Sequence, residues 1–486
     1  MQHATFRFDV TPPLGHGCCG GWITPVESVD DELEALGVVL VPGGGELPVV
    51  LCTFDWTGLA NEANATMRGA MAEAAGTTAD RVSIHVVHPH NAPMACTSTE
   101  KLLLDPAVAG APLQYGEHPL DLAFFDECLR KAREATAAAV ASGLVTVAEI
   151  ATGKAEVSEV ASNRRVDIGK DGKIDRARSS SCDDPEVRAL PVGTIDPYLR
   201  TVAFFGSDQS KLASMHFYAT HPMSYYGDGV VTADFAGLAR KQRQAEEPHC
   251  CHLYFNGCGG NIGAGKYNDG TPPMRPVLQQ RIYDAIVASE SDDALQRQPW
   301  DPTDPNASFF EWRSTPLAGL ASIVEEEASL AAEAGLLQTI GDAGATCVER
   351  NRAAYEVVWL RRARPGSDGW EANPLLASSL TLNDAVLLCL PGELFVEYQL
   401  HAQSLRPDAF VATAAYADNG LWYVPTASEY PKGGYEAGVT FAADRDGAGA
   451  KTGCEALEVE FVRAIGDLMI AEEEEEDGLQ PSTARL

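Results

Sequence analysis

Apolar and polar positions along the chain follow two patterns, one typical of buried strands and the other of helices. Short apolar runs rich in β-branched residues predict strands, among them residues 35–42, 47–54 and 82–87. Between the last two runs, residues 61–75 are rich in alanine and predict a helix. A strand, a helix and a further strand form a right-handed crossover unit by default. The first part of the chain therefore predicts an α/β architecture.

The same patterns continue along the rest of the chain. Further apolar runs predict strands at residues 144–150, 198–205, 212–220, 251–256, 376–382, 385–390 and 410–415. Helical periodicity predicts helices at residues 120–141, 233–244, 277–294, most of 317–362, and 454–471. No internal repeat and no clear linker divides the sequence. We therefore predict a single domain over residues 1–471, built from mixed β-sheets flanked by helices.

Histidines follow two of the predicted strands, and each of these strands ends at a histidine next to a proline. One strand is followed by H-P-H-N-A-P, which contains His88 and His90, and another is followed by His221. Proline donates no backbone hydrogen bond and restricts the residue before it, so the chain leaves the sheet at both points. Ligands of α/β proteins usually bind at the ends of strands. These histidines are therefore candidate ligand-binding residues.

Two further polar side chains lie just beyond apolar runs, the carboxylate of Glu393 and the phenol of Tyr423. Together with the three histidines they form a set of nitrogen and oxygen donors that suits zinc. The positions lie more than 300 residues apart, so their spacing alone does not show that they meet. Each has a structural alternative, because Glu393 could stabilise a helix N-terminus and Tyr423 could cap a strand. The residues alone make a metal hydrolase one candidate function.

The composition narrows the range of partners. Of the 486 residues, 45% are hydrophobic and 22% are charged, as in ordinary globular proteins. The net charge of −33 disfavours nucleic acid and anionic membrane surfaces as partners, because both would repel it. Part of the charge lies in residues 472–486, which predict an acidic, disordered tail. We therefore expect a small-molecule substrate, and the sequence leaves the oligomeric state open.

Cysteine usage and targeting signals indicate the compartment. The sequence does not begin with a basic segment and an apolar core, and no run approaches the roughly 18 apolar residues of a membrane span. The 12 cysteines include two adjacent pairs and no C-x-x-C motif, as expected for reduced thiols. The cluster at residues 249–252 contains metal-ligand types, but along a strand its neighbouring side chains would point to opposite faces. We predict a cytoplasmic protein without stable membrane association.

Four motifs, in this order, resemble those of the neutral (non-lysosomal) ceramidase family in its catalytic domain. H-P-H-N-A-P resembles the family's H-T-H-S-G-P, H-F-Y-A-T-H-P its second histidine motif, P-G-E-L its metal glutamate motif, and Y-V-P-T followed by G-G-Y-E its two-tyrosine motif. Tyr423 and Tyr435 keep the family's separation of twelve residues. The resemblance extends from D-V-T-P-P-L-G to beyond G-G-Y-E and covers nearly the whole chain. It implies a neutral-ceramidase-like catalytic domain.

The resemblance also implies a role for each motif residue. It implies a zinc ion held by four side chains: His88, His221, Glu393 and Tyr423. It implies that His90 and Tyr435 face the scissile carbonyl group, where they could stabilise an oxyanion. It further implies that an arginine in A-S-N-R-R contacts the substrate, and Arg164, directly after an asparagine, matches better than Arg165. Zinc would lower the pKa of a bound water to about 7 and so provide a nucleophile at neutral pH.

The sequence departs from the family pattern at three places. In the secreted enzymes an export signal precedes the family motifs, whereas here the motifs begin at residue 4. Those enzymes also carry a C-terminal immunoglobulin-like domain, whereas here an acidic segment follows the last helix. The family's G-D-V-S-P-N loop is replaced by G-G-N-I-G-A-G, which places Gly263 near the family's serine, and Asn91 replaces the serine of H-T-H-S. These changes preserve the metal set but alter the substrate pocket. A cytosolic, more polar substrate than a membrane lipid is therefore expected.

We predict a zinc-dependent hydrolase that cleaves an amide bond through a metal-activated water. One alternative is a metal-dependent esterase or a hydrolase of a sugar derivative, and another is a catalytically inactive ceramidase-like binding protein. Asp55 and Asp234 are candidates to orient the histidines, although both could equally be ordinary helix caps. His85 lies within its strand and is expected to be a core residue.

Overall fold

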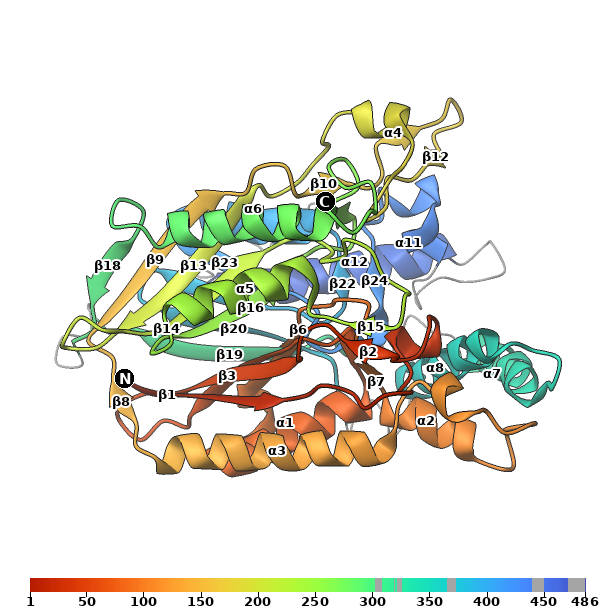
Figure 1. Ribbon diagram of the computed structural model, residues 1–486, viewed down its shortest axis with the longest axis horizontal. Coiled ribbons are helices and arrows are strands. Elements are labelled where there is room, and N and C mark those ends of the chain that lie inside the picture. Colours follow the sequence, from red (N-terminus) through yellow and green to blue (C-terminus); the bar gives the residue numbers. More distant parts are fainter. Residues whose placement is uncertain (302–307, 319, 321–325, 365–372, 439–449, 471–485) are drawn as a thin grey trace.

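Three β-sheets with helices on their outer sides form the body of the molecule (Figure 1). The structure is a computed structural model, and it describes the chain except for residues 302–307, 319, 321–325, 365–372, 439–449 and 471–485. Each sheet is mixed, since antiparallel pairs are joined by one parallel pair. The predicted class, mixed β-sheets flanked by helices, is confirmed. Nearly all of the predicted acidic tail, residues 472–485, lies outside the described residues, and the single domain stays a prediction.

The strands of each sheet come from one continuous part of the chain, except that the short strand β8 joins the first sheet from a later part. The first sheet has the order β6 (Val82–Val86), β4 (Val49–Phe54), β3 (Glu34–Val41), β1 (Gln2–Asp9) and β8 (Val145–Thr146). The second has the order β16 (Cys251–Asn256), β14 (Lys211–Tyr218), β13 (Tyr198–Phe205), β9 (Glu149–Glu156) and β18 (Gln296–Pro299). The third has the order β19 (Phe310–Pro316), β20 (Leu376–Leu382), β21 (Ala385–Cys389) and β23 (Phe410–Ala414).

The inner faces of the three sheets share one apolar core, to which Val38, Phe204 and Leu387 each contribute a fully buried side chain from a different sheet. The outer faces are covered by helices, as the amphipathic patterns predict. Helices α1 (Glu62–Ala75) and α3 (Leu122–Ala141) cover the first sheet, α5 (Asp234–Glu246) and α6 (Met274–Ser289) the second, and α10 (Val396–Leu405) and α12 (Ala450–Met469) the third.

Short strand pairs and the remaining helices gather at one end of the sheets, on the right of Figure 1. The short pairs are β2 (Ser28–Val29) with β15 (Val230–Val231), β5 (Gly58–Leu59) with β7 (Met94–Ala95), β10 (Ser162–Asn163) with β17 (Ile262–Gly263), β11 (Asp167–Ile168) with β12 (Ile174–Arg176), and β22 (Glu393–Leu394) with β24 (Tyr423–Val424). The helices are α2 (Thr97–Leu104), α4 (Pro185–Ala189), α7 (Glu326–Gly341), α8 (Cys347–Ala363) and α11 (Tyr435–Gly438).

The parallel pair of each sheet lies at its edge, and the three edge strands β6, β16 and β23 meet. Hydrogen bonds join them: His85 Nδ1 donates to the carbonyl oxygen of Ala415 at 2.8 Å, and the Ala415 amide donates to that of Asn256 at 2.8 Å. Because further bonds, from the Val86 amide to Tyr416 and from the Asn256 amide group to Val87, also join the carboxyl ends of these strands, the turns that follow them lie close together. His85 is fully buried in this junction, in agreement with its expected place in the core.

One helix prediction was wrong in its bounds. The helix predicted at residues 277–294 is α6, which starts three residues earlier, with Pro276 in its first turn, and ends at Ser289. The helical pattern predicted over most of 317–362 corresponds to α7 and α8 in the described residues, and Thr346 and Glu349 form the capping box at which α8 starts. Among the described residues no helix is long and apolar enough to cross a membrane.

Candidate metal centre

The turn after β6 directs one ring nitrogen of His88 toward the centre of the site. His88 is buried and has a φ of 77°, a strained conformation of the kind that gathers at functional sites. Its Nδ1 lies 2.5 Å from the carbonyl oxygen of Thr57. A carbonyl can only accept, so Nδ1 carries the proton and the lone pair is on Nε2. This is the tautomer of a histidine that binds a metal through Nε2.

His221, which follows β14, is held in the same way. Its Nδ1 lies 2.7 Å from the carbonyl oxygen of Gly259 and 3.2 Å from that of Ile262, so its lone pair is also on Nε2. Both carbonyls belong to the glycine-rich loop after β16. In that loop a methyl group on Gly260 would collide with the backbone of Glu393. The glycines therefore allow the loop to orient His221 while it packs against the segment of Glu393.

Glu393 and Tyr423 complete a set of four donors. They are directly paired in the register of β22 and β24, which places their side chains next to each other. Glu393 Oε2 lies 3.5 Å from His88 Nε2 and 3.3 Å from His221 Nε2, and it is a buried oxygen without a hydrogen-bond partner. The phenol oxygen of Tyr423 lies 3.0 Å from His221 Nε2. Four donor atoms from three different parts of the chain thus converge on one point.

The electrostatics of the centre suit a cation. Burial lowers the pKa of His88 to about 4, so this imidazole is neutral at pH 7. Burial alone would raise the pKa of Glu393, but His88 and His221 outweigh it, and the pKa lies below its usual value. The donors are thus two imidazole nitrogens, a carboxylate with an unpartnered oxygen and a phenol. This donor set fits a metal that prefers nitrogen and oxygen ligands, such as zinc.

His90 and Tyr435 border the open side of the donor set. His90 Nε2 lies 3.3 Å from His88 Nε2, and one ring nitrogen of each of the three histidines lies within 4.8 Å of the others, so by distance alone His90 is also a possible ligand. Tyr435 is half exposed, and its ring lies 5.8 Å from that of Tyr423. The exposed ring of Tyr226, which the sequence analysis did not identify, lies 4.9 Å from that of His90.

The structure distinguishes the two arginines of A-S-N-R-R. Arg164 is buried, and its Nη1 lies 3.2 Å from the phenol oxygen of Tyr423, so it adjoins the donor set. Arg165 points elsewhere and forms ion pairs with Glu429 at 3.1 Å and Glu436 at 2.8 Å. Glu436 also lies 3.2 Å from Arg164 Nε. Of the two, Arg164 is the one that contacts the candidate metal centre.

The two aspartates suggested as orienting residues do not contact the histidines. Asp55 forms an ion pair with Arg240 at 2.8 Å. Asp234, the first residue of α5, accepts hydrogen bonds from the amide and the hydroxyl of Ser224. Backbone carbonyls orient His88 and His221 instead, and a sequence pattern cannot indicate them. The sequence analysis also missed Tyr416, whose buried ring lies 4.6 Å from that of His88. Its position directly after an apolar strand is the same signal that identified the other site residues.

Comparison with known proteins gives a structural match only. No family model matches the chain, and no curated protein matches it. A crystal structure of neutral ceramidase from Pseudomonas aeruginosa aligns with a TM-score of 0.60 and 13% identity over 97% of this chain and 75% of that one. A structure of ceramidase complexed with C2 aligns with a TM-score of 0.60 and 12% identity over 100% of this chain and 76% of that one. The chain has a neutral-ceramidase-like fold.

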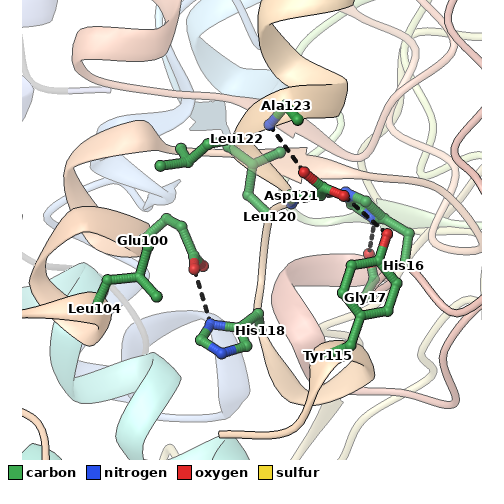
Figure 2. A pocket seen from close by; sticks show the side chains of 10 residues that line it. All are labelled: His16, Gly17, Glu100, Leu104, Tyr115, His118, Leu120, Asp121, Leu122 and Ala123. Carbon is green, nitrogen blue, oxygen red and sulfur yellow. Dashed lines mark hydrogen bonds and ion pairs between the residues drawn. The ribbon is translucent and has the colours of Figure 1, made fainter. Parts of the chain in front are cut away.

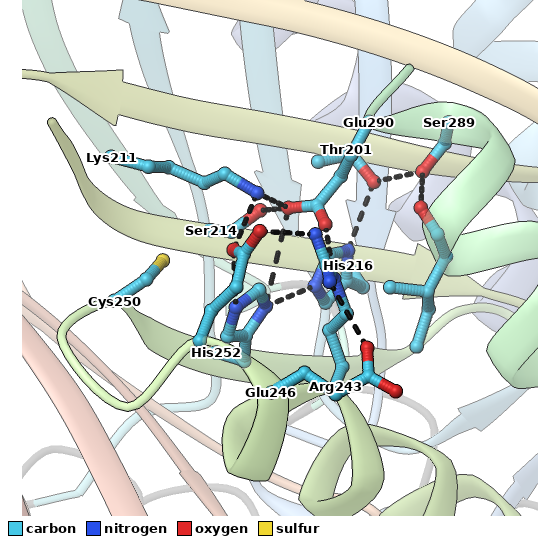
Figure 3. A network of polar contacts seen from close by, with 12 residues as sticks. Thr201, Lys211, Ser214, His216, Arg243, Glu246, Cys250, His252, Ser289 and Glu290 are labelled. Atoms are coloured by element: carbon cyan, nitrogen blue, oxygen red, sulfur yellow. Dashed lines mark hydrogen bonds and ion pairs between the residues drawn. The ribbon is translucent and has the colours of Figure 1, made fainter. Parts of the chain in front are cut away.

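A second histidine cluster in this ceramidase-like fold lies between the second sheet and helices α5 and α6 (Figure 3). His216, His252 and Glu290 offer ligand atoms within 4.8 Å, and Cys250 and His252 of the predicted 249–252 cluster lie beside Glu247. Hydrogen bonds use up the lone pairs. The Ser289 hydroxyl donates to the carbonyl oxygen of Ile286, so the Thr201 hydroxyl must donate to Ser289. Thr201 therefore accepts a hydrogen bond from Nδ1 of His216. The lone pair of His216 is then on Nε2, which accepts a hydrogen bond from Nδ1 of His252.

The remaining contacts of this cluster identify it as a charge network. The other ring nitrogen of His252 lies 3.2 Å from a carboxylate oxygen of Glu247 and donates to it. Lys211 Nζ lies 2.9 Å from one oxygen of Glu290, and Arg243 Nε lies 2.8 Å from the other. Because His252 donates from both ring nitrogens, it carries a positive charge like Lys211 and Arg243. With no free nitrogen lone pair and three cations already present, the cluster does not suit a metal ion.

A cavity of about 360 Å³ also lies apart from the metal centre, between α2, the loop before α3 and the start of α3 (Figure 2). Its polar lining is internally paired, since His118 lies 2.8 Å from Glu100 and the Tyr115 hydroxyl donates to Asp121. None of the seven predicted site residues lines it. The donor chemistry therefore makes the metal centre, rather than this cavity, the stronger candidate for a reactive site.

Proposed function

We propose that the protein is a zinc-dependent hydrolase that cleaves an amide bond of a small, water-soluble molecule. The observation that carries the proposal is the convergence of His88 Nε2, His221 Nε2, Glu393 Oε2 and the Tyr423 phenol oxygen. The similar structures are of ceramidases, which supports hydrolysis of an amide rather than another bond. The proposal thus combines a fold with a donor set that suits zinc.

A zinc ion held by these donors would supply a Lewis acid and a water that is activated at neutral pH. The chain's own groups on the open side can then stabilise an oxyanion. Burial lowers the pKa of His90, so the imidazole is neutral and keeps one N–H to donate. Burial raises the pKa of Tyr435, so its hydroxyl stays protonated and can donate as well. Either group can also pass a proton to the departing amine.

Arg164 acts from beside the Tyr423 oxygen. It is a buried, permanently charged group beside the Tyr423 oxygen, and it is held in place by Glu436. Its positive charge favours negative charge that develops in the site, more strongly than an exposed arginine would, because the site is shielded from water. In this proposal Arg164 fixes the position of Tyr423, and Arg165 fixes Glu436.

The glycine-rich loop supports a substrate other than a membrane lipid. A methyl group on Gly263 would lie 3.2 Å from the carbonyl oxygen of Ser179, so the family's serine would require the backbone at Ser179 to shift by a few tenths of an ångström. The eleven described cysteines form no disulfide, which supports a reducing compartment such as the cytoplasm. The site therefore keeps the metal donors of the resembled family and changes the pocket around them.

A hydrolysis screen tests this proposal. Purified protein is incubated with matched N-acyl amines, esters and glycosides, and the His88→Ala protein is compared with His249→Ala, which changes an exposed histidine outside the centre. We expect hydrolysis of N-acyl amines that disappears in His88→Ala and persists in His249→Ala. Cleavage of esters or glycosides without amides would replace the proposed reaction. Activity that survives in His88→Ala would refute the site.

A further inference from the structure

Tyr226 is an exposed aromatic residue that contacts the histidines of the metal centre. It is 50% exposed, and its ring meets that of His90 nearly edge-on, with 4.9 Å between the ring centres and 73° between the ring planes. His90 Nε2 in turn lies 3.3 Å from Nε2 of His88. Single exposed aromatic rings are common on protein surfaces, so it is the contact with His90 that gives this ring a place in the site. A molecule that approaches the donor set beside His90 therefore meets Tyr226.

The residues on both sides of Tyr226 are held in place. The ring of Tyr225 lies 3.8 Å from the guanidinium carbon of Arg275, and the Tyr225 carbonyl accepts a hydrogen bond from the same guanidinium at 3.1 Å. Gly227 has a φ of 91°, which favours glycine, and its amide donates to Oδ1 of Asn91 at 2.8 Å. Because both neighbours are fixed, the Tyr226 ring loses little conformational entropy when a ligand packs against it.

Asn91 of H-P-H-N-A-P connects this loop to the histidines. The Gly227 amide can only donate, so it faces Oδ1 and leaves Nδ2 of Asn91 to donate to the carboxylate of Asp228, at 2.6 Å. Asn91 is buried and directly follows His90, so one turn of the chain sets the positions of both His90 and the loop of Tyr226. A serine, the residue of the resembled family at this position, ends one atom earlier and would lose at least one of the two contacts without a shift.

We propose that Tyr226 is a specificity-determining residue, against which a flat apolar group of the substrate packs next to the scissile amide, and that Asn91 positions it. This inference rests on the proposed function and assigns a substrate class to the same site. A ring can stack on an exposed tyrosine ring or meet its edge, whereas a flexible alkyl chain must first be ordered. The proposed substrate is therefore an N-acyl amine that carries an aromatic group rather than a fatty chain.

Two matched pairs of probes test this class. N-acetylbenzylamine and N-acetylheptylamine differ on the amine side, and N-methylphenylacetamide and N-methyloctanamide differ on the acyl side. Within each pair the number of carbons is the same, and only the first member carries a ring. We expect wild-type protein to prefer the ring probe of at least one pair.

Variants of Tyr226 then locate the preference. In Tyr226→Ser we expect kcat/KM for the preferred ring probe to fall about tenfold through KM, so that its advantage over the alkyl partner is lost. Tyr226→Phe should keep the advantage, because it keeps the ring. Tyr115→Ser is the matched control, because Tyr115 is also 50% exposed but lines the separate cavity at the start of α3. It should leave all four probes unchanged.

A double substitution tests the positioning role of Asn91. Asn91→Ser alone should raise KM for the ring probe about threefold, because the loop of Tyr226 loses a contact. In the Tyr226→Ser background the same change should have an effect within about twofold, since the ring that it positions is already absent. An equal loss in both backgrounds would mean that Asn91 does not act through Tyr226.

Binding separates this inference from the proposed reaction. The same four probes are titrated calorimetrically into His88→Ala protein with and without Tyr226→Ser. A preference for a ring probe that Tyr226→Ser removes supports the assignment, even if none of the probes is hydrolysed. A preference that survives in Tyr226→Ser or disappears in Tyr226→Phe, or no preference for a ring probe in either assay, overturns it.

Discussion

Replacing Glu290 by glutamine should destabilise the protein at neutral pH. Burial alone would raise the pKa of Glu290, but His216 and Lys211 outweigh it, and the pKa falls to about 2. Burial also lowers the pKa of His216 to about 3, so His216 is neutral at pH 7 and contributes no charge that stabilises the Glu290 carboxylate at that pH. Lys211 at 2.9 Å, Arg243 at 2.8 Å and Ser214 at 2.5 Å are left to stabilise the carboxylate.

The size of this effect follows from the pKa. Each unit of difference between the folded and the unfolded pKa is worth about 1.4 kcal/mol, so a fall from 4.5 to about 2 sets an upper limit of about 3 kcal/mol. Neutral His216 supplies none of this at pH 7, so we expect an effect on the order of 2 kcal/mol. Because the folded pKa is depressed, this stability is fully present above about pH 4.5 and is lost as the pH falls toward 2. Glu290→Gln should therefore cost about 2 kcal/mol at pH 7, and the deficit should shrink below pH 4.5.

Urea denaturation followed by circular dichroism, from pH 7 down to pH 3, measures this deficit. Glu246→Gln is the control, because Glu246 pairs with Arg243 at 3.2 Å in the same network but is exposed. It should cost less than about 0.5 kcal/mol. A Glu290→Gln deficit no larger than that of the control, or one that is constant between pH 7 and pH 3, would refute an ionised Glu290 in the network.

Three further predictions concern the metal centre. Tyr435→Phe should lower kcat about a hundredfold while zinc content is unchanged, because it removes one oxyanion donor; equal loss of zinc would contradict that role. Gly260→Ala should lower zinc content and cost about 1–3 kcal/mol of stability, because the added methyl meets the Glu393 backbone; unchanged metal content would show that the loop does not position the donors. Zinc should be retained on gel filtration at pH 5, because the pKa of His88 is about 4 in the metal-free site and bound zinc competes with the proton; release near pH 6.5 would mean an ordinary histidine.

The sequence predicted the fold class and the strand-end residues because both depend on local pattern. The apolar runs before His88 and His221 form β6 and β14 nearly as expected. The helix bounds were less accurate, because they depend on capping interactions such as Thr346 with Glu349. Patterns of this kind describe one segment at a time, and they locate candidate residues without showing which segments meet.

The convergence of the donors could not be read from the sequence. It depends on the meeting of β6, β16 and β23 through hydrogen bonds such as that between His85 and Ala415, which lie 330 residues apart. The orientation of His88 and His221 depends on backbone carbonyls, which are present at every residue and leave no mark in the sequence. For the same reason, Asp55 and Asp234 were plausible orienting residues until their partners were known.

A crystal structure measured at the zinc absorption edge tests the central claim most directly. We expect one anomalous peak within about 2.0–2.2 Å of His88 Nε2, His221 Nε2, Glu393 Oε2 and the Tyr423 oxygen. We expect no peak at His216 and His252, where hydrogen bonds occupy the ring nitrogens. The absence of a peak among the four donors in zinc-loaded protein, or a peak at the second cluster instead, would contradict the claim.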